Sequence, residues 1–557
     1  MSSPRLDIDV LVVGTGPSGL ITALTLAKNG VSVRVIEKLP NHPEGQRGAG
    51  IMHFLGVLDD VKKFGSPVMD YQDWKDGKRT KSYPIMPILE ATPAFPERRV
   101  WVLGQDMTCS IFRQHLKAYG IEVELATELV RLDQEDEYVT AGVIRRKNGE
   151  EVEETITAKY VVGADGAKGM VRKLLGLTFL GETRDVLHFI IGDVEVHGVN
   201  KEYWHKFDDA PNDSVLLRPT DRVKKDNIYA LLAFGPNFDH ERALNDHQYL
   251  RQFVYSVAKV PELKIGKLEC IADYRPSIRV TNGFRKGRVF VAGDAGHVHS
   301  ATGGQGANSG VMDAFNLGWK LALASKGLAS PGLLDSYDAE RLPVIKEMLQ
   351  RTTSILDRTF ADRNGAPRAP AFDKEVTPSP WQRASQYNQL GVNYRWSPIV
   401  VDETNGELNG KNKDKAEELT ANTYVVEEGG RLHAGDRAPD APGLVDTETG
   451  SVRRLFDVFG PDHHTVLIFS DSQVTPVSDV VAHFPSGLIR TVMIRQHDAK
   501  ASETAGAADL VLQDREGYAY AAYGPTRVVV ARPDGVVGAL AGGAEGVQKY
   551  FSGIFAL

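Results

Sequence analysis

The chain has 557 residues, a length that predicts two or three domains rather than one hydrophobic core. The composition is that of an ordinary globular protein, with 42% hydrophobic and 25% charged residues. A formal net charge of −8 argues against a nucleic-acid-binding protein, because such proteins neutralise phosphates. The only cysteines, Cys109 and Cys270, exclude a disulfide scaffold and a Cys-based metal centre. With neither a signal peptide nor a run of about 18 apolar residues, we expect a cytoplasmic protein without a membrane span.

The first predicted element is a buried β-strand over residues 8–13. Gly14-x-Gly16-x-x-Gly19 follows directly, then a helix that ends near Gly30 and a second strand over residues 31–36. This βαβ unit carries a dinucleotide fingerprint, in which the first glycine makes a tight turn, the second leaves room for a pyrophosphate and the third packs helix on strand. Glu37 follows the second strand, where a carboxylate can bind ribose hydroxyls. The alternative is a glycine-rich turn that serves packing alone.

Two further glycine motifs follow predicted strands. Gly163-Ala164-Asp165-Gly166 comes after a strand over residues 159–162, and Gly293-Asp294-Ala295-Gly296-His297 after a strand over residues 288–292. A glycine-rich run over residues 303–310 then opens a long helical stretch that Pro343 is expected to interrupt. An aspartate before a glycine turn can bind a ribityl hydroxyl, and the N-terminus of a helix can present N–H groups to a cofactor.

In this order, the three motifs resemble those of the single-component flavoprotein aromatic hydroxylases, the group A monooxygenases that include p-hydroxybenzoate hydroxylase and phenol hydroxylase. The resemblance runs from about residue 8 to 345, and the tail with Gly435-Asp436-Arg437-Ala438-Pro439-Asp440 resembles the thioredoxin-like domain of the phenol hydroxylase branch. It implies an α/β fold with four parts: a Rossmann-like FAD-binding domain at 1–180 and 270–360, an inserted substrate-binding β-sheet domain at 181–269, a linker at 361–430 and a thioredoxin-like domain at 431–557.

The resemblance implies FAD as the cofactor and NADPH or NADH as a transient reductant. The residues that it assigns to FAD are Gly14, Gly16, Gly19, Glu37, Arg47, Gln105, Asp165, Gly166, Asp294, Gly304, Gly306, Ala307 and Asn308, with Arg113 as a further candidate. Three departures from the family pattern bear on reduction, oxygen handling and the substrate pocket. They are Gly169 in place of a serine, the run His299-Ser300-Ala301-Thr302 in place of prolines, and the absence of a second arginine after Arg47.

The implied activity is that of an FAD-dependent monooxygenase that hydroxylates a phenolic substrate with NAD(P)H and O2 through a 4a-hydroperoxyflavin. Oxidative decarboxylation of a hydroxybenzoate is a variant of this chemistry. Residues 140–287 carry no second dinucleotide fingerprint, as expected if the reductant binds transiently. Two alternatives stay open: a monooxygenase of a larger aromatic or quinone metabolite of polyketide type, and a non-catalytic flavoprotein or scaffold whose tail mediates assembly, for example as a homodimer.

A donor or base near the substrate hydroxyl should favour the ionised, reactive form of the ring. The predicted catalytic residues are His53, Tyr229 and Tyr274; further candidates, each of which can equally be structural, are Tyr203, His205, Arg218, Arg275 and Arg279. His297 and His299 have no further ligands in suitable spacing, so we expect no metal site. The tail lacks a Cys-x-x-Cys pair, which predicts a packing or dimer role rather than dithiol exchange.

Overall fold

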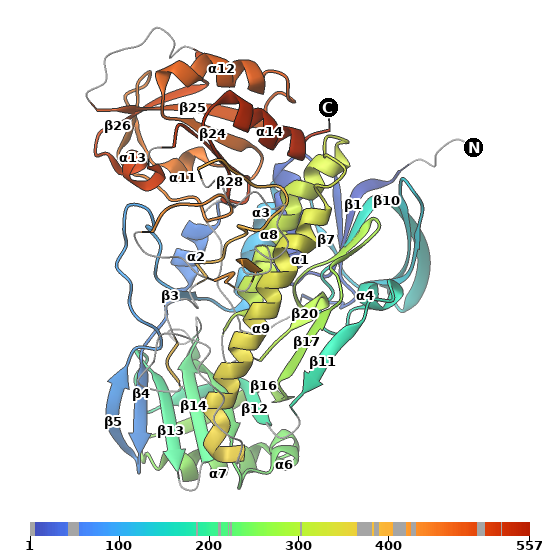
Figure 1. Ribbon diagram of the computed structural model, residues 1–557. Coiled ribbons are helices and arrows are strands. Elements are labelled where there is room, and N and C mark those ends of the chain that lie inside the picture. The colour runs from blue at the N-terminus through green and yellow to red at the C-terminus, as the bar shows by residue number, and fades with distance from the viewer. Residues whose placement is uncertain are drawn as a thin grey trace.

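Three large β-sheets lie one above another along the molecule (Figure 1). The C-terminal sheet is at the top of this view, the N-terminal sheet is in the middle and a seven-stranded sheet is at the bottom. The α/β fold class predicted from the sequence is therefore confirmed. The computed structural model describes residues 6–42, 55–184, 188–209, 213–220, 222, 226–300, 304–364, 381–383, 389–404, 419–420, 422–424, 430–497, 507–524 and 526–556.

The N-terminal sheet is built on the predicted βαβ unit. Its order is β18-β19-β10-β1-β2-β7, with β8 and β9 joined to β10, and β1 pairs in parallel with both β2 and β10. Val10, Leu11 and Val12 are completely buried, as expected for a strand covered on both faces. The strands are β1 (Ile8–Val13), β2 (Val33–Ile36), β7 (Val123–Glu124), β8 (Thr127–Gln134), β9 (Val139–Lys147), β10 (Glu150–Gly163), β18 (Arg285–Lys286) and β19 (Val289–Val291).

Helix α1 (Pro17–Lys28) packs between α3 (Gln105–Lys117) and α8 (Gly306–Ser325). α1 and α8 approach closely because Gly318 has no side chain: a Cβ there would lie 2.6 Å from the Thr25 methyl carbon. Both helices begin directly after glycine motifs, so their packing brings the two motifs together. The shorter α2 (Leu58–Phe64), α4 (Met170–Leu174) and the 3₁₀ turn η1 (Gly293–Ala295) complete this part. No helix within the described ranges is long and apolar enough to cross a bilayer.

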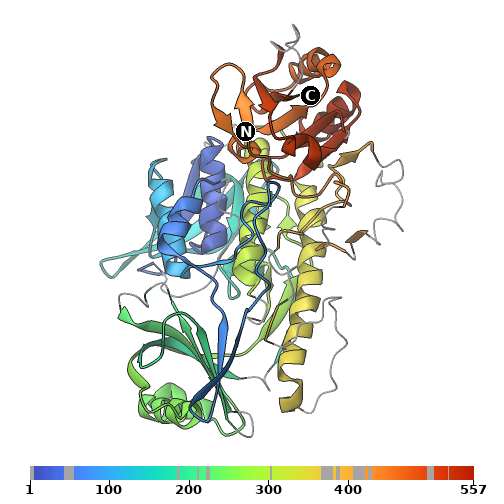
Figure 2. The ribbon, with the colours of Figure 1, turned by 90° about the vertical axis from the view of Figure 1, so that its left-hand side faces the viewer.

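The long helix α9 (Asp335–Asn364) runs from the C-terminal part to the seven-stranded sheet (Figures 1 and 2). The prediction that Pro343 interrupts the helical stretch is wrong. The break lies at residues 326–334, where Gly327 has a φ of +71°, and Pro343 is inside α9. Proline has no N–H for the carbonyl of Ala339 four residues earlier. The indole Nε1–H of Trp396 donates to that carbonyl instead, at 2.7 Å.

The seven-stranded sheet has the order β16-β12-β15-β14-β13-β4-β5. It extends beyond the stretch 181–269 in which the sequence predicts a sheet, because two of its strands come from residues 71–83 and β16 runs on to Tyr274. One face packs on α6 (His240–Asn245) and α7 (His247–Ala258). The strands are β4 (Tyr71–Lys75), β5 (Lys78–Tyr83), β12 (Phe189–His197), β13 (Trp204–Asp209), β14 (Asp213–Pro219), β15 (Ile228–Phe234) and β16 (Lys264–Tyr274).

Two small sheets join the larger ones. The first has the order β11-β17-β20, and the second pairs β3 with β6. Their strands are β11 (Phe179–Thr183), β17 (Ser277–Thr281), β20 (His297–Val298), β3 (Ser66–Pro67) and β6 (Trp101–Val102).

The C-terminal sheet has the order β21-β28-β27-β24-β25-β26-β22-β23. β24, β25 and β26 are parallel, and β27 and β28 continue the sheet as an antiparallel pair, as in the predicted thioredoxin-like arrangement. The elements are β21 (Val401–Asp402), β22 (Leu444–Asp446), β23 (Val452–Arg453), α11 (Leu455–Val458), β24 (His464–Ile468), α12 (Asp471–Val481), β25 (Ile489–Gln496), β26 (Leu510–Asp514), α13 (Tyr518–Tyr523), β27 (Val528–Ala531), β28 (Val537–Ala541) and α14 (Ala544–Ile554).

A buried cluster of charges joins the C-terminal part to the N-terminal part. The two Nη atoms of Arg532 donate to Glu340 on α9, at 2.7 and 3.0 Å. Lys320 on α8 donates to the same carboxylate at 2.7 Å, and all three side chains are fully buried. Burial disfavours the charged carboxylate, but Arg532 and Lys320 outweigh it and hold the pKa of Glu340 well below its usual range. Burial lowers the pKa of Lys320 to about 8, although Glu340 opposes the shift.

We predict that Glu340→Gln lowers the free energy of unfolding by about 3–5 kcal/mol, because it removes the carboxylate that neutralises the buried Lys320 and leaves Arg532 with Asp534 as its remaining carboxylate partner. Urea denaturation followed by tryptophan fluorescence measures the loss. The control is Arg131→Gln, which removes an exposed ion pair with Asp133 and should cost about 0–1 kcal/mol. Equal, small losses in both variants would contradict the prediction.

Candidate active site

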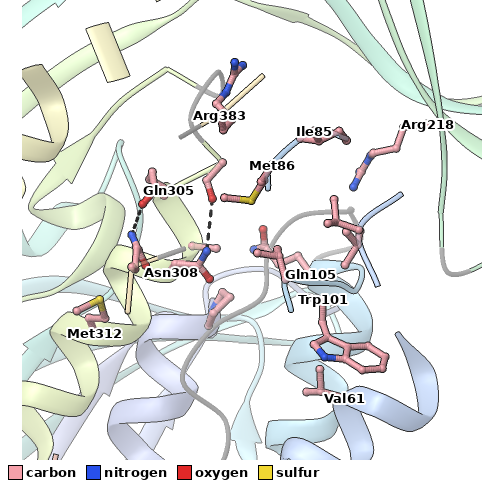
Figure 3. A pocket seen from close by; sticks show the side chains of 18 of the residues that line it. Val61, Ile85, Met86, Trp101, Gln105, Arg218, Gln305, Asn308, Met312 and Arg383 are labelled. Atoms are coloured by element: carbon pink, nitrogen blue, oxygen red, sulfur yellow. Dashed lines mark hydrogen bonds between the residues drawn. The ribbon is translucent and has the colours of Figure 1, made fainter. Parts of the chain in front are cut away.

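A cavity of about 1160 Å³ lies where the three parts of the molecule meet. Its lining residues come from the first turns of α1, α3 and α8, from one face of the seven-stranded sheet and from the C-terminal part. Figure 3 shows part of this lining, with Gln105, Asn308 and Arg218 on different sides of the space. The three glycine motifs predicted from the sequence all contribute to it, through Gly16, Gly166 and the run 304–307.

The first motif combines two packed glycines with an open one. A Cβ on Gly14 would lie 2.4 Å from the carbonyl oxygen of Ala164, and one on Gly19 would lie 2.1 Å from the carbonyl oxygen of Gly14. A Cβ on Gly16, by contrast, would have no protein atom within 4 Å. Gly14 and Gly19 therefore allow close backbone packing, whereas Gly16 leaves free space at the N-terminus of α1. That end of the helix carries unpaired N–H groups and partial positive charge, which suits a pyrophosphate.

Glu37 is held at the end of β2 by the same turn. Its Oε2 accepts hydrogen bonds from the backbone N–H and the hydroxyl of Thr15, at 3.2 and 2.8 Å, and its Oε1 accepts one from the N–H of Leu39 at 3.0 Å. The carboxylate is buried and fixed in position. Such a fixed acceptor fits the ribose of a dinucleotide.

The second motif has a buried acceptor without a partner. The Val171 N–H donates to Asp165 Oδ2 at 3.0 Å, but no hydrogen bond from the described residues reaches the buried Oδ1. Burial raises the pKa of Asp165. A Cβ at position 169 would lie 2.2 Å from Asp165 Oδ1, so a serine there would require the Asp165 carboxylate to move. Arg113 likewise has a buried Nη1 without a partner in the described part of the chain. Unpaired buried polar atoms fit a site that a polar ligand completes.

The third motif forms the base of the cavity. Asp294 lies in η1, and Gly304, Gly306, Ala307 and Asn308 line the space at the start of α8. A Cβ on Gly306 would lie 2.9 Å from Nε2 of His299, so a larger residue there would require the His299 ring to move. Figure 3 shows Gln305 and Asn308 side by side on this helix end.

A buried hydrogen-bond network behind this motif fixes its position. Asp313 on α8 accepts a hydrogen bond from the Gly293 N–H at 3.0 Å and one from Arg341 Nε at 2.7 Å, and its Oδ2 lies 2.6 Å from His297 Nε2. Burial opposes ionisation of Asp313, but His297 and Arg341 dominate and lower its pKa to about 2. His297 thus has a structural partner, and no group of three or more His, Cys, Asp or Glu side chains in the described ranges is placed to bind a metal.

The face of the seven-stranded sheet that borders the cavity is mostly apolar. Arg218 and Tyr274 lie on it, and the Arg218 guanidinium stands 5.3 Å from the centre of the Trp204 ring. The remaining side chains of this wall include Phe189, Ile191, Leu216 and Leu232. Apolar walls with a few polar groups are typical of sites for small organic ligands.

The other predicted substrate residues lie outside the cavity lining. Tyr229 points to the opposite face of the sheet, is fully buried and donates its hydroxyl to the Asn200 carbonyl at 3.1 Å. The prediction that Tyr229 is a catalytic residue is therefore wrong, because the alternation of side chains along the strand turns Tyr229 away from the cavity. His205 is buried on that face too, and its burial lowers its pKa to about 4. Tyr203, Arg275 and Arg279 also lie outside the lining, and Arg47 and His53 fall outside the described residues.

Several lining residues were missed in the sequence analysis. Trp381 and Arg383 come from the stretch interpreted as a linker, and Asp193 comes from β12. Arg437, from the motif that opens the C-terminal part, and Phe456 reach the cavity as well. Strand alternation could have indicated Asp193 once the register was known, but no local pattern indicates the others.

Comparison with known proteins identifies the family. The model of the FAD binding domain family matches residues 7–352, more than half of the chain. A flavin-dependent monooxygenase from Mycobacteroides abscessus is 31% identical over 492 residues, which cover 85% of this chain and 90% of the relative. The chain is a flavin-dependent monooxygenase of this family.

The pentachlorophenol 4-monooxygenase of Sphingobium chlorophenolicum is 27% identical to this monooxygenase over 493 residues, covering 83% of this chain and 80% of the relative. The crystal structure of aklavinone-11 hydroxylase in a ternary complex with FAD and aklavinone shares the fold, with a TM-score of 0.75, 24% identity and coverage of 98% of this chain and 99% of that one. These findings confirm the resemblance to group A aromatic hydroxylases and FAD as the cofactor of the monooxygenase.

We predict that Gly16→Val abolishes FAD binding without unfolding the monooxygenase. A side chain there meets no protein atom and would occupy only the space open to the cofactor. Flavin content after purification measures the loss of FAD, and far-ultraviolet circular dichroism shows whether the variant is folded. The matched control is Gly332→Val, a second open glycine, outside the cavity lining, which should keep its flavin. Full flavin occupancy in Gly16→Val would refute the assignment.

We also predict that Asp294→Ala weakens FAD binding by about ten- to a hundredfold. One charge-assisted hydrogen bond contributes about 1.5–3 kcal/mol, which corresponds to this range. Fluorescence titration of the apoprotein with FAD measures the dissociation constant. A value within twofold of the parent would show that the carboxylate does not hold the cofactor.

Proposed function

We propose that the monooxygenase hydroxylates an aromatic substrate with a phenolic hydroxyl group, using O2 and FAD that NADPH or NADH reduces. One observation carries the proposal: a single cavity runs from the glycine motifs to the apolar wall of the seven-stranded sheet. A ring bound against that wall lies next to the cofactor site. When bound, FAD supplies the oxygen chemistry, and the protein supplies position and exclusion of water.

The residues proposed to hold FAD are those that the resemblance to the family assigns, and the open position at Gly16 and the unpaired atoms of Asp165 and Arg113 support this assignment. Gly16 would admit the pyrophosphate and Glu37 would accept the ribose hydroxyls. Asp294 would bind the ribityl chain, Gln105 would contact the flavin, and residues 304–308 would lie beneath the ring system. Arg113 and Asp165 would use their unpaired polar atoms. Gly14 and Gly19 shape the turn.

We also propose a role for each part of the molecule. Residues 1–180 and 270–360 would bind FAD, apart from strands β4 and β5, which belong with residues 181–274 in the substrate-binding part. The C-terminal part, which contains neither cysteine, would act by packing, and Arg437 and Phe456 would close one end of the cavity. A homodimer through this part is an open possibility that gel filtration can test.

The size of the cavity favours a second candidate, a monooxygenase of a larger aromatic or quinone metabolite of polyketide type. About 1160 Å³ exceeds the usual range of about 300–1,000 Å³ for small-molecule sites, although the flavin would occupy part of the space. Of the proteins named above, one is a pentachlorophenol 4-monooxygenase and the other is an aklavinone-11 hydroxylase in complex with aklavinone. Oxidative decarboxylation of a hydroxybenzoate is a third outcome that products would reveal.

We predict that the purified protein is yellow and that a phenolic or polyphenolic compound accelerates its oxidation of NADPH or NADH. The assay screens phenols, hydroxybenzoates and anthraquinone-type aglycones, with mass analysis of the products. A product heavier than the substrate by one oxygen atom supports hydroxylation, and loss of CO2 identifies the decarboxylating variant. Flavin reduction that no aromatic compound accelerates would contradict the proposed function and favour a non-catalytic flavoprotein.

A further inference from the structure

The cavity wall on the seven-stranded sheet carries a carboxylate, Asp193, and a guanidinium, Arg218, in one row across the strands. Asp193 on β12 pairs in register with Ala230 on β15, and Ala230 pairs in register with Arg218 on β14. The three residues therefore lie across three neighbouring strands on the face that borders the cavity. Because Ala230 has only a methyl group, no long side chain of β15 stands between Asp193 and Arg218 on this face.

This pair stands out because its surroundings on the wall are apolar. Phe189 and Ile191 precede Asp193 on the wall, and Leu216 precedes Arg218. The guanidinium of Arg218 is held against the Trp204 ring, and Figure 3 shows the side chain directed toward the cavity. A polar group placed in such a wall is typical of a site that orients one polar substituent of an otherwise apolar ligand.

The Asp193 carboxylate is half-buried, and no hydrogen bond or ion pair engages it within the described residues. Its neighbour across the pairing with β16, Glu269, is already engaged by Lys267 at 2.7 Å and by Arg222 at 3.1 Å. Of the two carboxylates Asp193 and Glu269, Asp193 is therefore the one that is available to bind a ligand. Burial raises its pKa, as do the charges of Asp106 and Glu269, while Arg218 and Arg222 oppose the shift.

We propose that Asp193 is the base that removes the hydroxyl proton of the substrate and that Arg218 holds the resulting phenolate. In this step the O–H bond of the substrate breaks, the proton moves to a carboxylate oxygen of Asp193, and the electron pair stays on the substrate oxygen. The negative charge then faces the Arg218 guanidinium, and the proton passes to solvent when the product leaves. This role rests on the proposed function as an aromatic hydroxylase and assigns the removal of the phenolic proton to named residues.

The decisive experiment compares two phenols of different acidity in the FAD-loaded enzyme. At pH 8 phenol is protonated and needs a base, whereas 2,4,6-trichlorophenol is already ionised. Asp193→Asn should lower kcat/KM for phenol by about 100-fold, the lower end of the usual contribution of a general base, and that for trichlorophenol less than threefold. Arg218→Gln should lower both values. Equal losses on the two substrates in Asp193→Asn, or no loss on phenol, would overturn the proposal.

The pH profile gives a second readout that a structural role would not move. A carboxylate base is active when ionised, so kcat/KM of the parent for phenol should fall as the pH drops through the raised pKa of Asp193. Asp193→Asn should lose this acid limb, and Asp193→Glu should restore it in part. Persistence of the limb in Asp193→Asn would assign it to another group and refute the role.

Binding of 4-nitrophenol separates this proposal from the proposed function. Its phenolate absorbs in the visible range, so the fraction ionised in the complex can be followed without turnover. The parent should bind the phenolate with an apparent pKa at least one unit below that of free 4-nitrophenol, and Arg218→Gln should abolish this shift. The same apparent pKa in both proteins would overturn the role of Arg218, whether or not the enzyme turns over any phenol.

Glu195→Gln is the matched control, because it removes a carboxylate from the same strand outside the cavity lining. It should keep kcat/KM for both phenols within twofold of the parent. Flavin content and tryptophan fluorescence establish that each variant is folded. If the parent oxidises NADPH with none of the aromatic compounds screened, the proposed function fails and the base assignment fails with it.

Discussion

A charged side chain buried in a protein needs an opposite charge beside it. Two such side chains, Glu340 and Arg341, are neighbours on α9, and much of the structure packs around their ion pairs. Glu340 takes Arg532 from the C-terminal sheet and Lys320 from α8, while Arg341 takes Asp313, which also fixes the Gly293 turn. Since one helix carries both residues, the docking of the C-terminal part and the shape of the cofactor site depend on the same backbone segment. Removing one member of either pair deprives its buried partner of an opposite charge.

The cavity lies between elements that these ion pairs hold in place. On one side stand helix ends and glycines, which offer N–H groups and free space to a charged cofactor. On the other side lies a sheet face of aromatic and aliphatic side chains that also carries Asp193 and Arg218. The two walls differ in chemistry in the way that the proposed function requires: the first would bind the anionic cofactor, and the second would orient a planar apolar molecule by one polar substituent.

The elements that could be predicted from the sequence are those whose signal is local. Gly14, Gly16 and Gly19 lie in one turn between a strand and a helix, so their roles follow from spacing alone. Tyr229 and Ala230 are neighbours in the sequence, yet only one faces the cavity, and that choice depends on pairing with strands far away in the chain. Arg437 and Trp381 reach the site through tertiary packing, which produces no periodic pattern in the sequence. Pro343 was misinterpreted because the residue that compensates for it, Trp396, belongs to another segment.

The hydrogen bond from Trp396 to the Ala339 carbonyl has a consequence for synthesis of the chain on the ribosome. When α9 first emerges, the carbonyl that Pro343 leaves open can bond only to water, and Glu340 has neither Ser397 nor Arg532 beside it. The central helix therefore gains these buried partners only after residues 396, 397 and 532 have been synthesised. Its final packing depends on segments that lie far behind it in the order of synthesis.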